Sequence, residues 1–130
     1  VEAGTRVEYR HPDPSSNPYL AAVAVLSAGL DGVEHKIEPE EPIQENVYHL
    51  PREELERHGV GVLPGNLEEA LKAFRADRVV YDALGGYISE NLMELKRREY
   101  EEYLSYVGGS WEKNLNRITE WEIERYLTRC

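Results

Sequence analysis

Residues 6–20 read R-V-E-Y-R-H-P-D-P-S-S-N-P-Y-L, and this stretch decides how the fold begins. Successive side chains of an extended chain point to opposite faces. Arg6, Glu8 and Arg10 would therefore share one face of a strand, while Val7 and Tyr9 share the other. The alternation predicts a short strand on which two cations flank one carboxylate.

The charged face of this strand has two interpretations. It can line an anionic site, where the carboxylate is a hard oxygen ligand for a divalent cation and the arginines clamp phosphate or carboxylate oxygens. It can also be a solvated edge strand with an ordinary row of salt bridges. Spacing alone favours the second interpretation, because charged faces are common on strands.

A helix is predicted to follow directly. Asn17 is a good N-cap residue, and Pro18 suits the first helical position, where its missing N–H costs nothing. The apolar surface that follows predicts a helix over residues 18–30 that is covered on most of its sides. Gly32 suits a left-handed position at the helix end. The apolar stretch is too short to span a bilayer.

The rest of the chain is predicted to consist of helices separated by Gly and Pro breaks. These helices cover about residues 52–58, 67–75, 77–84 and 89–106, and a terminal helix follows them. Asn66 and Asp77 are expected to cap two of them, and Thr119 with Glu122 forms a capping box for the terminal helix. The charge run E-L-K-R-R-E-Y-E-E is predicted to be a solvated face, and Gly108-Gly109 is predicted to stop the longest helix.

Composition narrows the class of protein. The chain has 130 residues, 41% of them hydrophobic, and a formal net charge of -10, which makes it a poor candidate for binding nucleic acid or an anionic membrane. The single cysteine, Cys130, leaves no intramolecular disulfide, so a reducing cytoplasm is the expected compartment. The four histidines are too scattered along the sequence to indicate a metal cluster.

The stretch from Arg6 to Leu20, continued by A-V-L-S-A-G-L-D-G-V-E-H-K-I, resembles the C-terminal part of class I glutamine synthetase of the bacterial and archaeal type. The shared pattern is an Arg-x-Glu-x-Arg strand, Pro-Asp, Asn-Pro-Tyr-Leu and an Ala-Gly-Leu-Asp-Gly helix end. The later segments E-N-V-Y-H-L-P, L-P-G-N-L-E-E-A-L, E-L-K-R-R-E-Y-E-E-Y and W-E-I-E-R-Y-L follow in the family order. Residues 108–118 depart from the pattern, which leaves their path open.

The resemblance implies an α+β fold, of which this chain is a mostly helical part. Residues 1–130 would be the C-terminal part of the catalytic domain, with one N-terminal active-site strand followed by about six helices. The N-terminal β-grasp domain and most of the catalytic barrel would lie outside this sequence. The resemblance also implies a cytoplasmic homo-oligomer, a dodecamer of two hexameric rings. The terminal helix would reach the opposing ring or dock on its own subunit.

The activity implied by the resemblance is ATP-dependent ligation of ammonia to the γ-carboxylate of glutamate through a γ-glutamyl phosphate, which forms glutamine. Glu8 matches the ligand of a metal, Mg²⁺ or Mn²⁺, that sits on the nucleotide phosphates. Arg6 matches an arginine that contacts the ATP phosphates, and Arg10 matches the arginine that holds the glutamate substrate. Tyr48 takes the place of a tyrosine that some bacterial enzymes adenylylate, although a simply packed tyrosine is the alternative.

Two other functions stay open at this point. Relatives of the family join glutamate to polyamines or other amines, and the residues that select ammonia would lie outside this sequence. A different class of function is a helical assembly module without catalysis. One carboxylate does not hold Mg²⁺ without substrate phosphates and further ligands, so the isolated chain is expected to be inactive.

Overall fold

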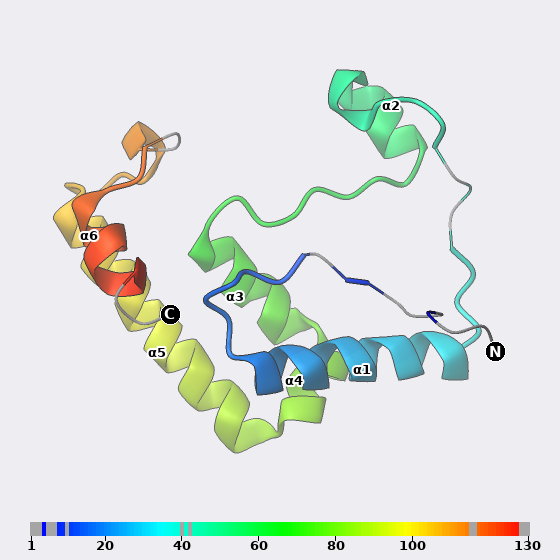
Figure 1. Cartoon of the computed structure of the whole chain (residues 1–130), viewed down its shortest axis with the longest axis horizontal. Coiled ribbons are helices and arrows are strands. Elements are labelled where there is room, and N and C mark those ends of the chain that lie inside the picture. The colour runs from blue at the N-terminus through cyan, green and yellow to red at the C-terminus, as the bar shows by residue number, and fades with distance from the viewer. Residues whose placement is uncertain are drawn as a thin grey trace.

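The computed structural model describes residues 4, 8–9, 11–39, 41, 43–114 and 117–127 (Figure 1). Its helices are α1 (Pro18–Glu34), α2 (Arg52–Arg57), α3 (Leu67–Ala76), α4 (Arg78–Leu84), α5 (Gly86–Tyr106) and α6 (Glu120–Glu122), with the short helical turns η1 (Val47–His49), η2 (Glu112–Asn114) and the π-helical η3 (Ile123–Leu127). The predicted helical character is confirmed. Glu8 and Tyr9, the described members of the predicted strand, have no regular secondary structure, and Arg6, Val7 and Arg10 lie outside the described residues.

Helix α4 is the centre of the packing. It contacts α1, α3 and α5, and α3 also packs on α5. Tyr81 and Leu84 of α4 are 8% and 9% exposed, and the ring of Phe74 lies 5.5 Å from that of Tyr81. Helix α2 stands apart from the other helices on a long loop, and α6 lies beside α5 (Figure 1). The described chain is therefore an open arrangement of helices around a small core.

The predicted helix caps are confirmed. The Asn17 side chain accepts a hydrogen bond from the Tyr19 N–H at 3.0 Å, and the Asn66 side chain accepts one from the Glu69 N–H at 2.9 Å. The Asp77 carboxylate caps α4 in the same way, and Thr119 forms the predicted capping box at the start of α6. Each cap satisfies N–H groups that the helix itself leaves without partners.

The joint between α4 and α5 takes a single residue. Gly85 has a φ of 81°, a conformation that is open to glycine and strained for other residues. The chain can therefore restart a helix at Gly86, three residues before the predicted start at Ser89. Ser89 is fully buried at this corner, where its hydroxyl donates a 2.7 Å hydrogen bond to the Tyr81 carbonyl.

The predicted end of α1 is wrong. The helix continues to Glu34, and Gly32 is part of it. The left-handed residue is Lys36, with a φ of 51°, and the next N–H, that of Ile37, bonds back to the Gly32 carbonyl at 2.9 Å. This six-to-one bond is the pattern of a Schellman motif, which satisfies the last carbonyls of the helix wherever the chain can turn.

The predicted cover of α1 is also wrong for the described chain. No residue of α1 is buried, and Tyr19, Leu26 and Leu30 are 80%, 66% and 68% exposed. Helix α4 packs on α1, yet it leaves these side chains open. Among the described residues, no helix combines the length and the apolar character that crossing a membrane requires. Much of the apolar surface that the sequence provides in α1 is therefore open to solvent.

Candidate functional site

The segment that carries Glu8 runs toward α1. The ring of Tyr9 lies 4.8 Å from that of His11, and both line a cavity of about 570 Å³ together with Ala24 of α1 and Val80 of α4. Glu8 itself is exposed. Tyr9 thus lies against the helices, while its neighbour Glu8 is exposed.

A hydrogen-bonded turn links this segment to α1. The Asp13 carboxylate accepts bonds from the Ser15 hydroxyl at 2.5 Å and from the Ser15 N–H at 2.8 Å. These two bonds hold the pKa of Asp13 below its ordinary value. The Ser16 N–H bonds to the Asp13 carbonyl at 2.9 Å, and the Asn17 cap follows at once. Local hydrogen bonds therefore fix the direction in which the chain enters α1.

The described residues do not bring the predicted site together. Arg6 and Arg10 lie outside them, so the relation of these arginines to Glu8 stays a prediction. Tyr48 is in η1 and is 94% exposed. No group of three His, Cys, Asp or Glu side chains able to hold a metal ion occurs in the part of the chain that the structure describes. As an exposed carboxylate, Glu8 would suit the role of one oxygen ligand of Mg²⁺, and the described residues offer no group of further ligands beside it.

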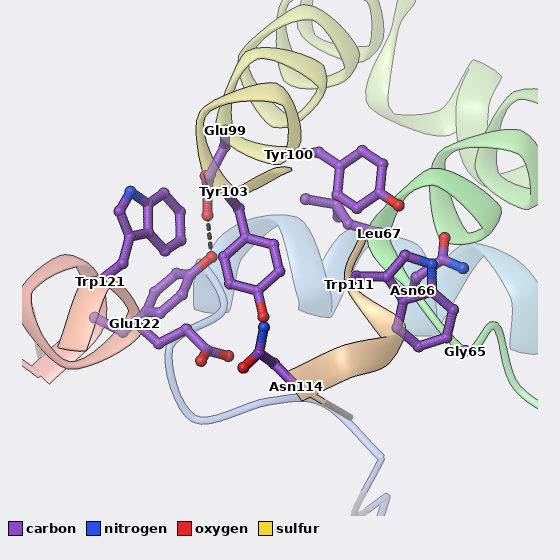
Figure 2. A pocket seen from close by; sticks show the side chains of 11 residues that line it. Gly65, Asn66, Leu67, Glu99, Tyr100, Tyr103, Trp111, Asn114, Trp121 and Glu122 are labelled. Carbon is purple, nitrogen blue, oxygen red and sulfur yellow. Dashed lines mark hydrogen bonds between the residues drawn. The ribbon is translucent and has the colours of Figure 1, made fainter. Parts of the chain in front are cut away.

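A second polar centre lies where the C-terminal segment, residues 119–127 with α6 and η3, meets α5. Glu99 is only 5% exposed, and it accepts hydrogen bonds from the Tyr126 hydroxyl and, at 2.9 Å, from Lys96. Figure 2 shows Glu99 and the first of these two bonds as a dashed line. Burial raises the pKa of Glu99, but the hydrogen bonds from Tyr126 and Lys96 outweigh it and leave that pKa below its ordinary value. Burial and the bond to Glu99 raise the pKa of Tyr126 strongly.

The sequence interpretation missed this centre. The charge run of α5 is largely the solvated face that was predicted, and Glu94 pairs with Arg98 at 2.6 Å. For Glu99 the prediction is wrong, because this carboxylate is buried. The spacing carried a signal: Glu99 follows Leu92 by seven residues and precedes Tyr103 by four, so it lies on the apolar stripe of the helix.

We expect Tyr126→Phe to loosen the C-terminal segment. The substitution leaves the buried Glu99 carboxylate without one of its donors, which costs about 1–3 kcal/mol. Hydrogen exchange of residues 119–127 should therefore become at least about fivefold faster at neutral pH. Because the pKa of Glu99 is lowered in the folded state, the contribution is present above about pH 4.5 and is lost as the pH falls through the folded pKa.

The control for this variant is Tyr87→Phe, since Tyr87 is on α5, the helix that carries Glu99, and is 84% exposed. Its hydrogen exchange should match that of the unmodified protein. Equal exchange in both variants would show that the Tyr126 hydroxyl does not hold the segment.

Comparisons with a family model and with curated proteins identify the same family. Residues 1–126 match the family model described as glutamine synthetase, catalytic domain. Glutamine synthetase from Pyrococcus horikoshii is 50% identical over 125 residues, which cover 95% of this chain and 28% of that protein. The enzymes so named from Thermotoga maritima and Halobacterium salinarum are 45% and 40% identical, again over 95% of this chain.

The chain spans about a quarter of the length of these curated relatives. The match nevertheless runs through both the Glu8 segment and the C-terminal segment that docks on α5. The chain belongs to the glutamine synthetase family and represents part of its catalytic domain.

Proposed function

We propose that the protein containing this chain joins ammonia to glutamate at the expense of ATP. The observation that carries the proposal is the match of residues 1–126 to the catalytic domain of the family, together with relatives of that name at up to 50% identity. A glutamate ligase that uses a polyamine or another amine is the alternative within the family, and no observation on this chain favours it.

The proposed reaction has two steps. A γ-carboxylate oxygen of glutamate takes the γ-phosphoryl group of ATP, and ADP leaves. Ammonia then attacks the carbonyl carbon of the γ-glutamyl phosphate, a C–N bond forms, the C–O bond to phosphate breaks, and ammonia loses a proton. Both steps depend mainly on positioning and on stabilising negative charge.

The residues of this chain would act in the first step. Arg6 would contact the phosphates of ATP, and Arg10 would hold the carboxylate of glutamate, because a guanidinium donates two parallel hydrogen bonds to such groups. Glu8 would be one ligand of Mg²⁺ or Mn²⁺. When bound, the metal would neutralise charge on the nucleotide phosphates. The accessible position of Glu8 supports its role.

The exposed surface of α1 supports the proposal that this chain works as part of a larger body. A stable free module would bury an apolar helix, whereas Leu26 and Leu30 are more than half exposed. We propose that residues 1–130 are the C-terminal part of the catalytic domain, and that the β-grasp domain and most of the barrel lie outside this sequence.

Assembly, compartment and modification stay predictions. The dodecamer of two hexameric rings and the cytoplasmic location rest on the family alone. Trp121 and Tyr126 dock on α5 of their own chain, where the Trp121 ring lies 5.4 Å from that of Tyr103. Tyr48 is exposed in the described chain, and its adenylylation rests on the resemblance alone, with a tyrosine packed in the longer protein as the alternative.

The test is ATP-dependent phosphate release by the longest natural protein that contains this sequence. We expect release only when glutamate and ammonia are both present. Release with glutamate and a polyamine, but not with ammonia, would assign the protein to the alternative ligases. If phosphate is released with neither amine, the non-catalytic helical assembly module remains as the alternative.

A further inference from the structure

We propose that the cavity between α3, α5 and the C-terminal segment binds a quaternary ammonium group. The cavity has a volume of about 300 Å³, at the lower end of the roughly 300–1,000 Å³ typical of ligand pockets. Its size therefore suits a small cation. Five aromatic side chains line it: Tyr100, Tyr103, Trp111, Trp121 and Tyr126.

Three separate segments bring these rings together. The two α5 tyrosines lie one helical turn apart, and Trp111 follows the glycine turn that ends this helix. Trp121 and Tyr126 come from the C-terminal segment. Figure 2 shows Tyr103 in the middle, with Trp121 on one side of it and Tyr100 and Trp111 on the other. The cavity therefore exists only when the C-terminal segment is docked.

The chain already places its own cations on two of the rings. The Arg125 guanidinium lies 5.6 Å from the centre of the Trp121 ring, and the Lys96 ammonium lies 5.9 Å from that of Tyr126. Both distances are within the range of a cation–π interaction. Within the described residues, no such cation lies over the other three rings of the cavity, although Tyr103 packs against Trp121. For Tyr100 and Trp111, the described part of the chain shows neither a cation nor another aromatic ring in contact.

The charge around the cavity favours a cation. The carboxylates of Glu99 and Glu122 are part of its lining. Burial, together with the carboxylates of Glu68, Glu112 and Glu69, raises the pKa of Tyr100. The side of the cavity that Tyr100 lines is therefore also negatively charged. The two cations over the rings are already paired, Lys96 with Glu99 and Arg125 with Glu102. Glu122 is therefore the carboxylate of the lining that has no ion pair among the described residues.

A quaternary ammonium fits this lining better than an inorganic cation. It is weakly hydrated and needs no hydrogen-bond acceptor, and aromatic cages recognise it through their ring faces. Glu99 already accepts bonds from Tyr126 and Lys96, and Glu122 accepts two from Thr119. The cavity can therefore recognise a cation through its aromatic rings and through the more distant charge of the carboxylates.

The first measurement is a titration with choline of the longest natural protein that contains this sequence. Binding is monitored by the tryptophan fluorescence of Trp111 and Trp121. We expect saturable binding below about 10 mM and at least about fivefold weaker binding of 3,3-dimethylbutanol, the neutral isostere of choline. Equal binding of the two compounds, or no saturable change with choline, would overturn the proposal. The absence of a saturable change is also the result expected if another segment of the longer protein fills the cavity.

Substitutions in the lining test the cavity directly, and calorimetry measures the affinity of each variant for choline. Tyr100→Leu should weaken choline binding about fivefold to tenfold, because one ring face is lost. Glu122→Gln should weaken it as well, and it keeps the helix start intact because glutamine also serves in a capping box. Tyr87→Leu, on the exposed side of α5, should leave binding unchanged. Unchanged binding in Tyr100→Leu and Glu122→Gln would contradict the assignment.

Discussion

Replacing Glu8 by alanine in the longest natural protein that contains this sequence should lower kcat by about 10²–10³-fold. In the proposed site, Glu8 would be an oxygen ligand of the metal, and the bound metal would neutralise charge on the phosphates of the nucleotide. The substitution would remove this ligand. Because Glu8 is exposed and outside the small core, the protein should still fold and assemble. Steady-state kinetics at saturating glutamate, ammonia and ATP would measure the loss.

The matched control is Glu53→Ala, which removes an exposed carboxylate from α2. Its turnover should equal that of the unmodified protein. Near-normal turnover of Glu8→Ala would refute the role of Glu8, whereas a loss of assembly in that variant would assign Glu8 a structural role instead.

Leu26→Asp should prevent the longer protein from folding or assembling. Leu26 is 66% exposed on α1, where a charge would normally be harmless. If the rest of the catalytic domain covers this face, the aspartate becomes a buried and unpaired charge, which costs several kcal/mol. The expected result is a loss of soluble, assembled protein, measured by size-exclusion chromatography and by the midpoint of thermal unfolding.

Two controls separate burial from the general effect of a substitution. Leu26→Met nearly conserves volume and should cost less than about 1.5 kcal/mol. Ala73→Asp introduces the same charge on the exposed side of α3 and should be tolerated. If Leu26→Asp were as stable as Leu26→Met, α1 would remain exposed in the longer protein, and the proposed larger domain would lose its main structural support.

The sequence by itself determined the local structure. The caps at Asn17, Asn66, Asp77 and Thr119 were predicted correctly, because each depends on a side chain and an N–H group only two or three residues away. The stop at Gly108-Gly109 depends in the same way on the residues themselves, both of which have positive φ. The charged row of Glu8 with two arginines came from alternation and from the resemblance, and it remains a prediction.

Only the tertiary structure decided which of the remaining side chains are buried. Glu99 belongs to a charged run, yet the docking of Tyr126 encloses it, and this contact joins residues 27 positions apart. Trp111 joins the aromatic cavity only because the chain turns back after α5. Conversely, α1 has the sequence of a covered helix and is exposed here. Burial depends on what packs against a residue, and local sequence does not specify that partner.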